Sequence, residues 1–176
     1  DAFGNGVEIE DLVLSGEASM GITGRPRYDA GLVDNHIARL DILAASPRPF
    51  SPAERRSGID LRTLCERDLL VLDRGYQSRL TLDAALRLLS LSPSIRHEGG
   101  SGTVILALAR AGLGTAVIPA TTRTDLHTAK IIANGIVLGM DLAAIWDPAL
   151  RWRAEVEQFA DRLRASFASR RRAPRT

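Results

Sequence analysis

A glycine-rich corner with two hydroxyl groups is the stretch of this sequence best suited to hold a ligand. Residues 99–103 are Gly-Gly-Ser-Gly-Thr, and an apolar run over 104–111 predicts a helix directly after them. Glycine lets the backbone approach a bound group closely, and the first N–H groups of a helix attract anions. The corner therefore favours a carboxylate or a similar anion, although the lysine of a phosphate-binding P-loop is missing. The alternative is a tight strand-to-helix turn that needs glycine only for its backbone.

A second polar loop, residues 73–79, is Asp-Arg-Gly-Tyr-Gln-Ser-Arg and follows the apolar run 69–72. A helical pattern over 81–90 comes after it. Arg79 could pair with an anionic ligand or with a carboxylate of its own chain. Tyr76 could close over a ligand or pack against the loop.

These two loops belong to a predicted β-α-β-α-β segment. Its strands are 69–72, 95–98 and 115–118, and its helices are 81–90 and 104–111, the second ending at Gly112. Such strands are parallel with right-handed crossovers. Both loops therefore leave the carboxyl ends of strands at one sheet edge, where α/β folds bind ligands.

A third candidate is Gly24-Arg25, which follows a predicted short strand over 19–23. The alternative is that Arg25 points into solvent and contacts no ligand. The complete set of candidate ligand-contacting residues is Gly99, Gly100, Ser101, Gly102, Thr103, Gly75, Tyr76, Gln77, Ser78, Arg79, Gly24 and Arg25.

The other predicted elements frame this segment. They are a helix over 6–15 stopped by Gly16, one or two strands over 37–45, a short helix over 59–64 capped by Asp60, strands over 136–138 and 142–146, and a helix from Asp147-Pro148 to 168. Residues 46–58 contain three prolines and are predicted to be a linker, the first crossing between two lobes. Residues 120–135 are predicted to be irregular, with a turn at Asn134-Gly135, and residues 170–175 to be a frayed tail.

Composition excludes several classes of protein. The net charge is +2, but residues 151–176 carry +5, so the remainder carries −3, which does not indicate a nucleic-acid-binding domain. No apolar run approaches the roughly 20 residues that span a bilayer, and no signal peptide is visible. We expect no contact with a membrane.

The cysteine and histidine residues do not suggest chemistry. The single Cys65 fits a reducing cytosol and an inert buried thiol rather than a nucleophile. His36, His97 and His127 lack the spacing of metal ligands, and His97 is expected to be partly buried in its strand. We expect no metal, no cofactor and no catalytic residue.

Several motifs in order resemble the effector-binding domain of LysR-type transcriptional regulators over about residues 10–168. They are Ser15-Gly16-Glu17-Ala18-Ser19-Met20-Gly21-Ile22, where Ser19 replaces the family's usual aspartate, residues 59–64 followed by Leu69 to Leu72, Pro93 to Glu98, Ala111-Gly112-Leu113-Gly114, Ile118-Pro119, and the helix with Phe159. The run over 93–119 is the most specific.

This resemblance implies an α/β, two-lobed, type-2 periplasmic-binding-protein-like fold with two crossover segments and an effector cleft between the lobes. The first lobe would be residues 1–57 plus 131–176, and the second 58–130. The first lobe would lack its first strand and helix, and the family's helix-turn-helix domain would be missing, so we expect a truncated chain.

The resemblance further implies a cytoplasmic homodimer or homotetramer that senses a small effector and controls DNA binding through the missing domain. An extracytoplasmic solute-binding protein shares this fold and is the alternative; an upstream helix-turn-helix or signal peptide would separate the two. An enzyme on the same scaffold is a third hypothesis, but no set of residues in the sequence supports it.

Overall fold

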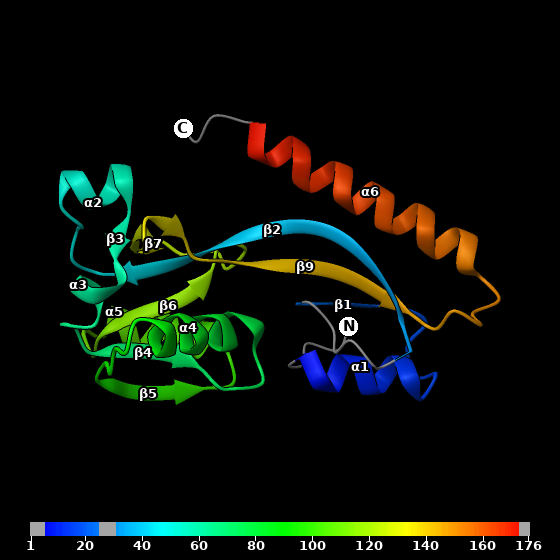
Figure 1. The fold of residues 1–176 in the computed structure, drawn as a ribbon, viewed down its shortest axis with the longest axis horizontal. Coiled ribbons are helices and arrows are strands. Elements are labelled where there is room, and N and C mark those ends of the chain that lie inside the picture. Colours follow the sequence, from blue (N-terminus) through cyan, green and yellow to red (C-terminus); the bar gives the residue numbers. More distant parts are fainter. Residues whose placement is uncertain (1–5, 25–30, 173–176) are drawn as a thin grey trace. The chain divides into compact units, whose positions relative to one another are not determined.

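The computed structural model describes residues 6–24 and 31–172, and it forms two compact units (Figure 1). Unit 1 is Asp1–Arg39 with Asp141–Thr176, and unit 2 is Leu40–Met140. Strands β2 (Val33–Ser46) and β9 (Gly139–Trp146) contribute residues to both units. The lobe limits expected at 57/58 and 130/131 both lie within unit 2.

Unit 2 is built on a sheet with the strand order β2-β6-β4-β5. Strands β4 (Leu69–Leu72), β5 (Ile95–Gly99) and β6 (Thr115–Pro119) are parallel, and β2 pairs antiparallel with β6. The predicted parallel β-α-β-α-β segment is therefore confirmed. Because β4 lies between β6 and β5, the two loops that follow β4 and β5 leave neighbouring strands.

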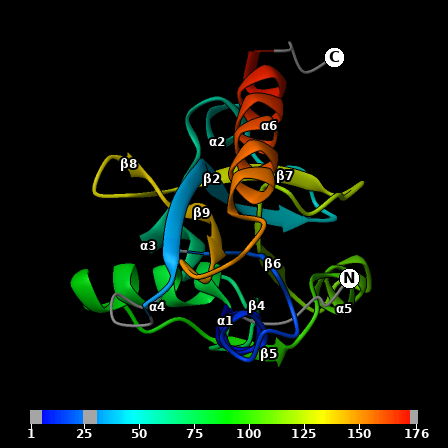
Figure 2. The same ribbon diagram turned by 90° about the vertical axis from the view of Figure 1, so that its right-hand side faces the viewer.

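Helices α4 (Gln77–Leu88) and α5 (Gly102–Arg110) cover opposite faces of this sheet (Figure 2). Successive side chains of a strand point to opposite faces. Leu69 and Val71 accordingly pack in the core that contains the buried side of α4, whereas Leu70 and Leu72 pack in the core that contains the buried side of α5. A continuous apolar strand such as β4 is what burial on both faces requires.

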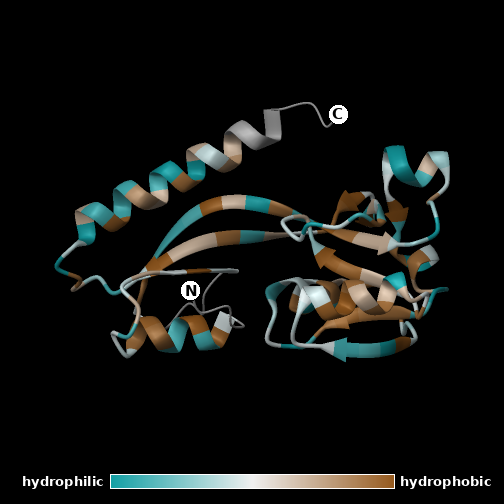
Figure 3. Ribbon diagram, turned by 180° about the vertical axis from the view of Figure 1, so that it is seen from behind, coloured by the Kyte–Doolittle hydropathy of each residue, from teal (hydrophilic) through white to brown (hydrophobic). Residues whose placement is uncertain are grey.

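The outer strand β5 is polar in contrast, as the teal arrow of Figure 3 shows. Arg96, His97 and Glu98 are all exposed. Charged side chains on an edge strand discourage pairing with another chain. The expectation that His97 is partly buried is wrong, because an edge strand leaves it open to solvent.

The segment predicted to be a linker instead contains helix α2 (Pro52–Ser57). Ser51 and Glu54 form a reciprocal capping box, with each side chain accepting a hydrogen bond from the other residue's backbone N–H. Hydrogen bonding to the Glu54 carboxylate by the side chain and the backbone N–H of Ser51 lowers the pKa of Glu54. The prolines had suggested an irregular chain, but proline is also favourable in the first turn of a helix.

Strand β3 (Ile59–Asp60) leads into helix α3 (Leu61–Leu64), whose N-cap is Asp60 as predicted. Strand β7 (His127–Ala133) then pairs with β2, β3 and β8 (Ile136–Val137), so the prediction of irregular structure over 120–135 is wrong for 127–133. The predicted turn at Asn134-Gly135 is confirmed, since both residues have positive φ.

Unit 1 contains helix α1 (Gly6–Leu14), strand β1 (Gly21–Gly24) paired antiparallel with β9, and helix α6 (Arg153–Arg172). Gly16 follows α1 with φ 77°, as expected of a helix stop. The predicted start of the last helix at Asp147 is wrong. Asp147 accepts a hydrogen bond from Ala149 N at 2.7 Å, but this caps a turn, and α6 begins only at Arg153. Among the described residues, no helix is long and apolar enough to cross a membrane.

We predict that Gly58→Ala destabilises the protein more than Gly112→Ala. Both glycines have positive φ, 94° and 78°. A Cβ at Gly58 would lie 2.7 Å from the Lys130 carbonyl oxygen, whereas a Cβ at Gly112 would meet nothing within 4 Å. Backbone strain alone should cost about 1 kcal/mol at Gly112, and strain with the clash about 2–4 kcal/mol at Gly58. Urea unfolding measures both, and equal losses would contradict the contact.

Candidate functional site

The two glycine-containing loops meet at the carboxyl edge of the unit 2 sheet, as predicted. Asp73 N donates to Gly99 O at 3.1 Å, continuing the pairing of β4 and β5 by one residue. The Tyr76 hydroxyl donates to Gly100 O at 2.5 Å. We call residues 73–77 and 99–103 the carboxyl-edge loops.

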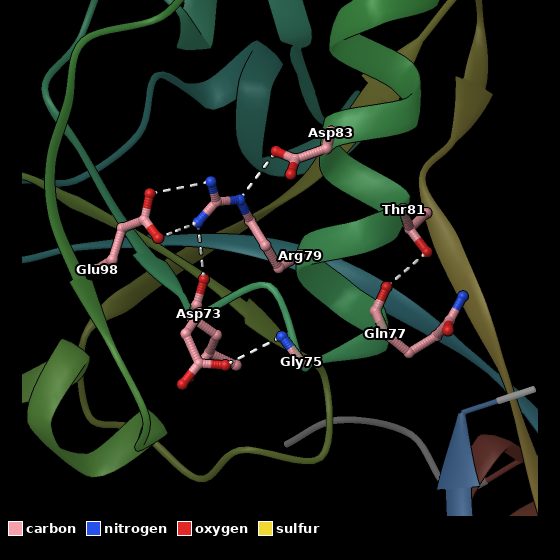
Figure 4. Close-up of polar contacts among 8 residues, drawn as sticks. Asp73, Gly75, Gln77, Arg79, Thr81, Asp83 and Glu98 are labelled. Atoms are coloured by element: carbon pink, nitrogen blue, oxygen red, sulfur yellow. Dashed lines mark hydrogen bonds and ion pairs between the residues drawn. The ribbon is translucent and has the colours of Figure 1, made fainter. Parts of the chain in front are cut away.

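Arg79 joins the strand ends and the helix that flank these loops (Figure 4). It is only 2% exposed. Its Nε donates to Asp83 at 2.8 Å, its Nη1 donates to the Leu72 carbonyl at 3.0 Å, and its two Nη atoms approach the two Glu98 carboxylate oxygens at 3.0 Å. One side chain thus joins the end of β4, the first turns of α4 and the end of β5. Of the two interpretations of Arg79, the structure shows pairing with carboxylates of its own chain.

Gln77, Ser78 and Arg79 were predicted to lie in a loop, but they form the first turn of α4. Ser78 is buried like Arg79, and the Gln77 carbonyl accepts a hydrogen bond from Thr81 Oγ1 at 2.8 Å. The helix starts earlier than predicted because an Asx turn, in which Asp73 Oδ1 accepts from Gly75 N at 3.1 Å, reverses the chain within three residues. Gly75, Tyr76 and Gln77 remain partly exposed.

The glycine corner is shaped by close packing. A Cβ at Gly99 would lie 3.2 Å from Ile105 Cδ1, and a Cβ at Gly100 would lie 3.3 Å from Asp73 Oδ2. Ser101 is the N-cap of α5, but its side chain makes no capping hydrogen bond. Its hydroxyl is therefore not used by the helix. The first N–H groups of α5 have no partner within the helix.

Sequence reasoning missed Arg74, which lies in the loop that precedes α4 and Arg79. Arg74 is exposed, and its charge contributes to lowering the pKa of Glu98, behind the hydrogen bond from Arg79 as the main cause. Arg79 is buried and paired within the fold, whereas Arg74 in the carboxyl-edge loops is exposed to solvent. The burial of the two arginines, which separates these roles, is not visible in a loop sequence.

The remaining candidates lie elsewhere. Gly24 ends β1 in unit 1 and pairs with Leu142, and Arg25 lies outside the described residues. Cys65 is half-buried, and burial raises the pKa of its thiol, which disfavours a thiolate nucleophile. Within residues 6–24 and 31–172, no group of three or more acidic, histidine or cysteine side chains could hold a metal ion.

We predict that Arg79→Met lowers the free energy of unfolding by about 2–3 kcal/mol, because it removes charged hydrogen bonds to Glu98 and Asp83 and leaves the Leu72 carbonyl without its donor. Arg79→Lys should lose less, since the charge stays. Arg87→Met is the matched control on the exposed side of α4, and it should change stability by less than about 0.5 kcal/mol. Urea unfolding that showed equal effects for Arg79→Met and Arg87→Met would contradict the role of Arg79.

We also predict a specific pH dependence. The hydrogen bond from Arg79 holds the pKa of Glu98 below its ordinary value. A lowered folded-state pKa contributes stability above the unfolded value of about 4.3, and this contribution is lost as the pH falls through the folded pKa. Glu98→Gln should therefore be less stable than the parent at neutral pH, and the gap should narrow below about pH 4. A gap independent of pH, measured by urea unfolding, would contradict the ion pair.

Comparisons with known proteins give a consistent result. The family model described as the LysR substrate binding domain matches residues 2–168. A curated relative, an uncharacterized HTH-type transcriptional regulator YybE of Bacillus subtilis (strain 168), is 29% identical over 68 residues, which are 39% of this chain and 23% of the relative.

Solved structures share the fold at low sequence identity. A mutant of Corynebacterium glutamicum OxyR has a TM-score of 0.77 at 22% identity, covering 94% of this chain and 53% of that one. HinK, a LysR family transcriptional regulator from Pseudomonas aeruginosa, has 0.76 at 18%, covering 94% and 58%. The CcmR regulatory domain of Synechocystis PCC6803, in complex with 2-PG, has 0.74 at 17%, covering 92% and 79%.

The chain thus spans about half the length of the OxyR and HinK chains, and its match to the curated relative covers 23% of that protein. The family model, however, matches nearly all of the chain. Together with the α/β architecture and the parallel strands of unit 2, this shows that the chain belongs to the LysR substrate-binding domain family.

Proposed function

We propose that the carboxyl-edge loops bind a small anionic effector. The observation that carries this proposal is the meeting of two loops from neighbouring parallel strands, Tyr76 against Gly100, at the N-terminus of α5. Carboxyl edges of parallel sheets are the usual ligand positions in α/β folds. The binding of 2-PG by the Synechocystis CcmR regulatory domain supports a small-molecule effector for a domain of this fold.

The charge of these loops supports an anion. The first N–H groups of α5 and the dipole of the helix favour negative charge. The hydroxyl groups of Ser101 and Thr103 would donate hydrogen bonds, and Arg74 would supply a charge. The negative charge of Glu98 would repel an anion, but the bidentate pairing of Glu98 with Arg79 neutralises this charge.

In the whole protein, effector binding would control DNA binding by a helix-turn-helix domain outside this chain. A ligand shifts such an equilibrium only through a difference in its affinity for the two states. We further propose that the domain works in the cytoplasm as part of a homodimer or homotetramer, and that it binds its effector without catalysis.

A thermal-shift screen of carboxylates, phosphate esters and amino acids tests this proposal. We expect at least one anion to raise the melting temperature. Ser101→Ala and Arg74→Ala should each weaken that ligand about tenfold, the loss of roughly 1.4 kcal/mol. Both side chains are away from the core, so the variants should fold.

The matched controls are Ser92→Ala and Arg87→Ala, whose exposed side chains lie outside the carboxyl-edge loops. They should leave the affinity within about twofold of the parent. If no anion stabilises the protein, or if the controls weaken binding as much as the loop variants do, the proposal fails.

A further inference from the structure

A pocket of about 520 Å³ lies at the opposite edge of the unit 2 sheet. It is bordered by the carboxyl end of β2, the amino ends of β5 and β6 and the turn before β4, all within unit 2. In Figure 1 these strand ends lie on the side away from the arrowheads of β4, β5 and β6. Strand β4 has four residues, so the pocket and the carboxyl-edge loops are separated by roughly 10–13 Å of strand. The pocket is therefore distinct from the proposed effector site.

Three arginines from three separate segments line this pocket: Arg48 after β2, Arg67 before β4 and Arg96 on β5. Two of them are held in place. Arg67 Nη2 donates to Glu54 Oε1 at 3.0 Å and lies over the Phe50 ring at 5.1 Å. Arg96 Nη1 donates to Asp68 at 2.8 Å. A guanidinium has more N–H donors than these contacts use, so both arginines keep donors for a ligand.

Arg48 differs from the other two arginines. Its backbone N–H donates to Ser46 Oγ at 3.1 Å, which fixes the loop. The side chain is exposed, and its guanidinium has no partner among the residues that the structure describes. Unlike Arg67 and Arg96, Arg48 has no carboxylate partner among the described residues. Its positive charge is therefore available to a ligand in the pocket.

The backbone forms another wall. A Cβ at Gly114 would lie 2.7 Å from the Asp68 carbonyl oxygen and 3.1 Å from Leu70 Cγ. Glycine is therefore required for the chain after α5 to pass this close to β4. The segment Gly112–Thr115 lines the pocket with backbone and small side chains except at Leu113. This leaves room for a ligand between the arginines.

We infer that this pocket is a second binding site, for a small organic anion with more than one carboxylate or phosphate group. Asp68 is the one acidic side chain in its lining, and Glu54 pairs with Arg67 from outside the lining. The three arginines and these two carboxylates therefore leave a net charge of +1. This exceeds the roughly half negative charge that the end of α5 contributes nearby. The volume falls in the range of small-molecule sites and exceeds what one inorganic ion fills. Planar guanidinium groups bind carboxylate and phosphate oxygens in pairs.

Isothermal titration calorimetry at low ionic strength with citrate and inorganic pyrophosphate tests this inference, and acetate serves as the singly charged comparison. We expect citrate or pyrophosphate to bind with a Kd below about 1 mM, and acetate at least about tenfold more weakly. The better of the two probes shows whether the site prefers carboxylate or phosphate. Binding should weaken with added salt.

Variants locate the bound anion. Arg48→Ala and Arg96→Ala should each weaken the better probe about tenfold or more. Arg62→Ala is the matched control, an exposed arginine of unit 2 outside the pocket lining, and it should leave the affinity unchanged. Ser101→Ala should also leave it unchanged, because Ser101 belongs to the carboxyl-edge loops.

Three results would overturn the inference: no binding of either probe below about 10 mM, an equal loss with Arg62→Ala, or insensitivity to Arg48→Ala. Binding that is lost with Ser101→Ala but kept with Arg48→Ala would place the anion at the carboxyl edge. That outcome would support the proposed effector site while removing the second one, so the two proposals fail separately.

Discussion

The buried guanidinium of Arg79 is the contact on which the candidate effector site depends. It bonds the Leu72 carbonyl at the end of β4, Asp83 within α4 and Glu98 near the end of β5. Burying a charge is costly unless it is paired and hydrogen-bonded, and Arg79 satisfies both conditions. The two loops above it therefore leave the sheet from strand ends whose positions are set by one side chain. The positions of the candidate ligand-binding groups on those loops therefore depend on Arg79.

The rest of unit 2 supports this arrangement through simple rules. Alternating side chains of β4 pack into two hydrophobic cores, one on the side of α4 and one on the side of α5. Both helices begin at the carboxyl edge because each follows a parallel strand. The same connections return the chain to the amino edge, where β2 ends and where Arg48, Arg67 and Arg96 gather. This topology gives the sheet two polar edges, with the glycine corner, hydroxyl groups and Arg74 at the carboxyl edge and three further arginines at the amino edge.

Local patterns predicted the parts of the fold that rest on a continuous apolar run or on local capping and turn conformation. The apolar run of β4, the Asp60 cap and the turn at Asn134-Gly135 were all visible in the sequence. Elements that depend on distant partners were not. Strand β7 has only two buried residues, Ala129 and Ile131, and two of its partners, β2 and β3, are far away in the chain. Helix α6 begins six residues after Asp147, because the local cap forms a turn and not the helix itself. The two roles of Arg74 and Arg79 depend on burial that appears only when β5 and α4 are folded together.

The proposed effector site requires that a small anion bind where the carboxyl-edge loops meet. The most direct measurement is the change in the backbone amide ¹H and ¹⁵N chemical shifts when the best anion from a ligand screen is added. We expect the largest changes at residues 73–77 and 99–104, including the first N–H groups of α5. Changes confined to residues 46–49, 67–68 and 112–115, with the carboxyl-edge loops unaffected, would contradict it.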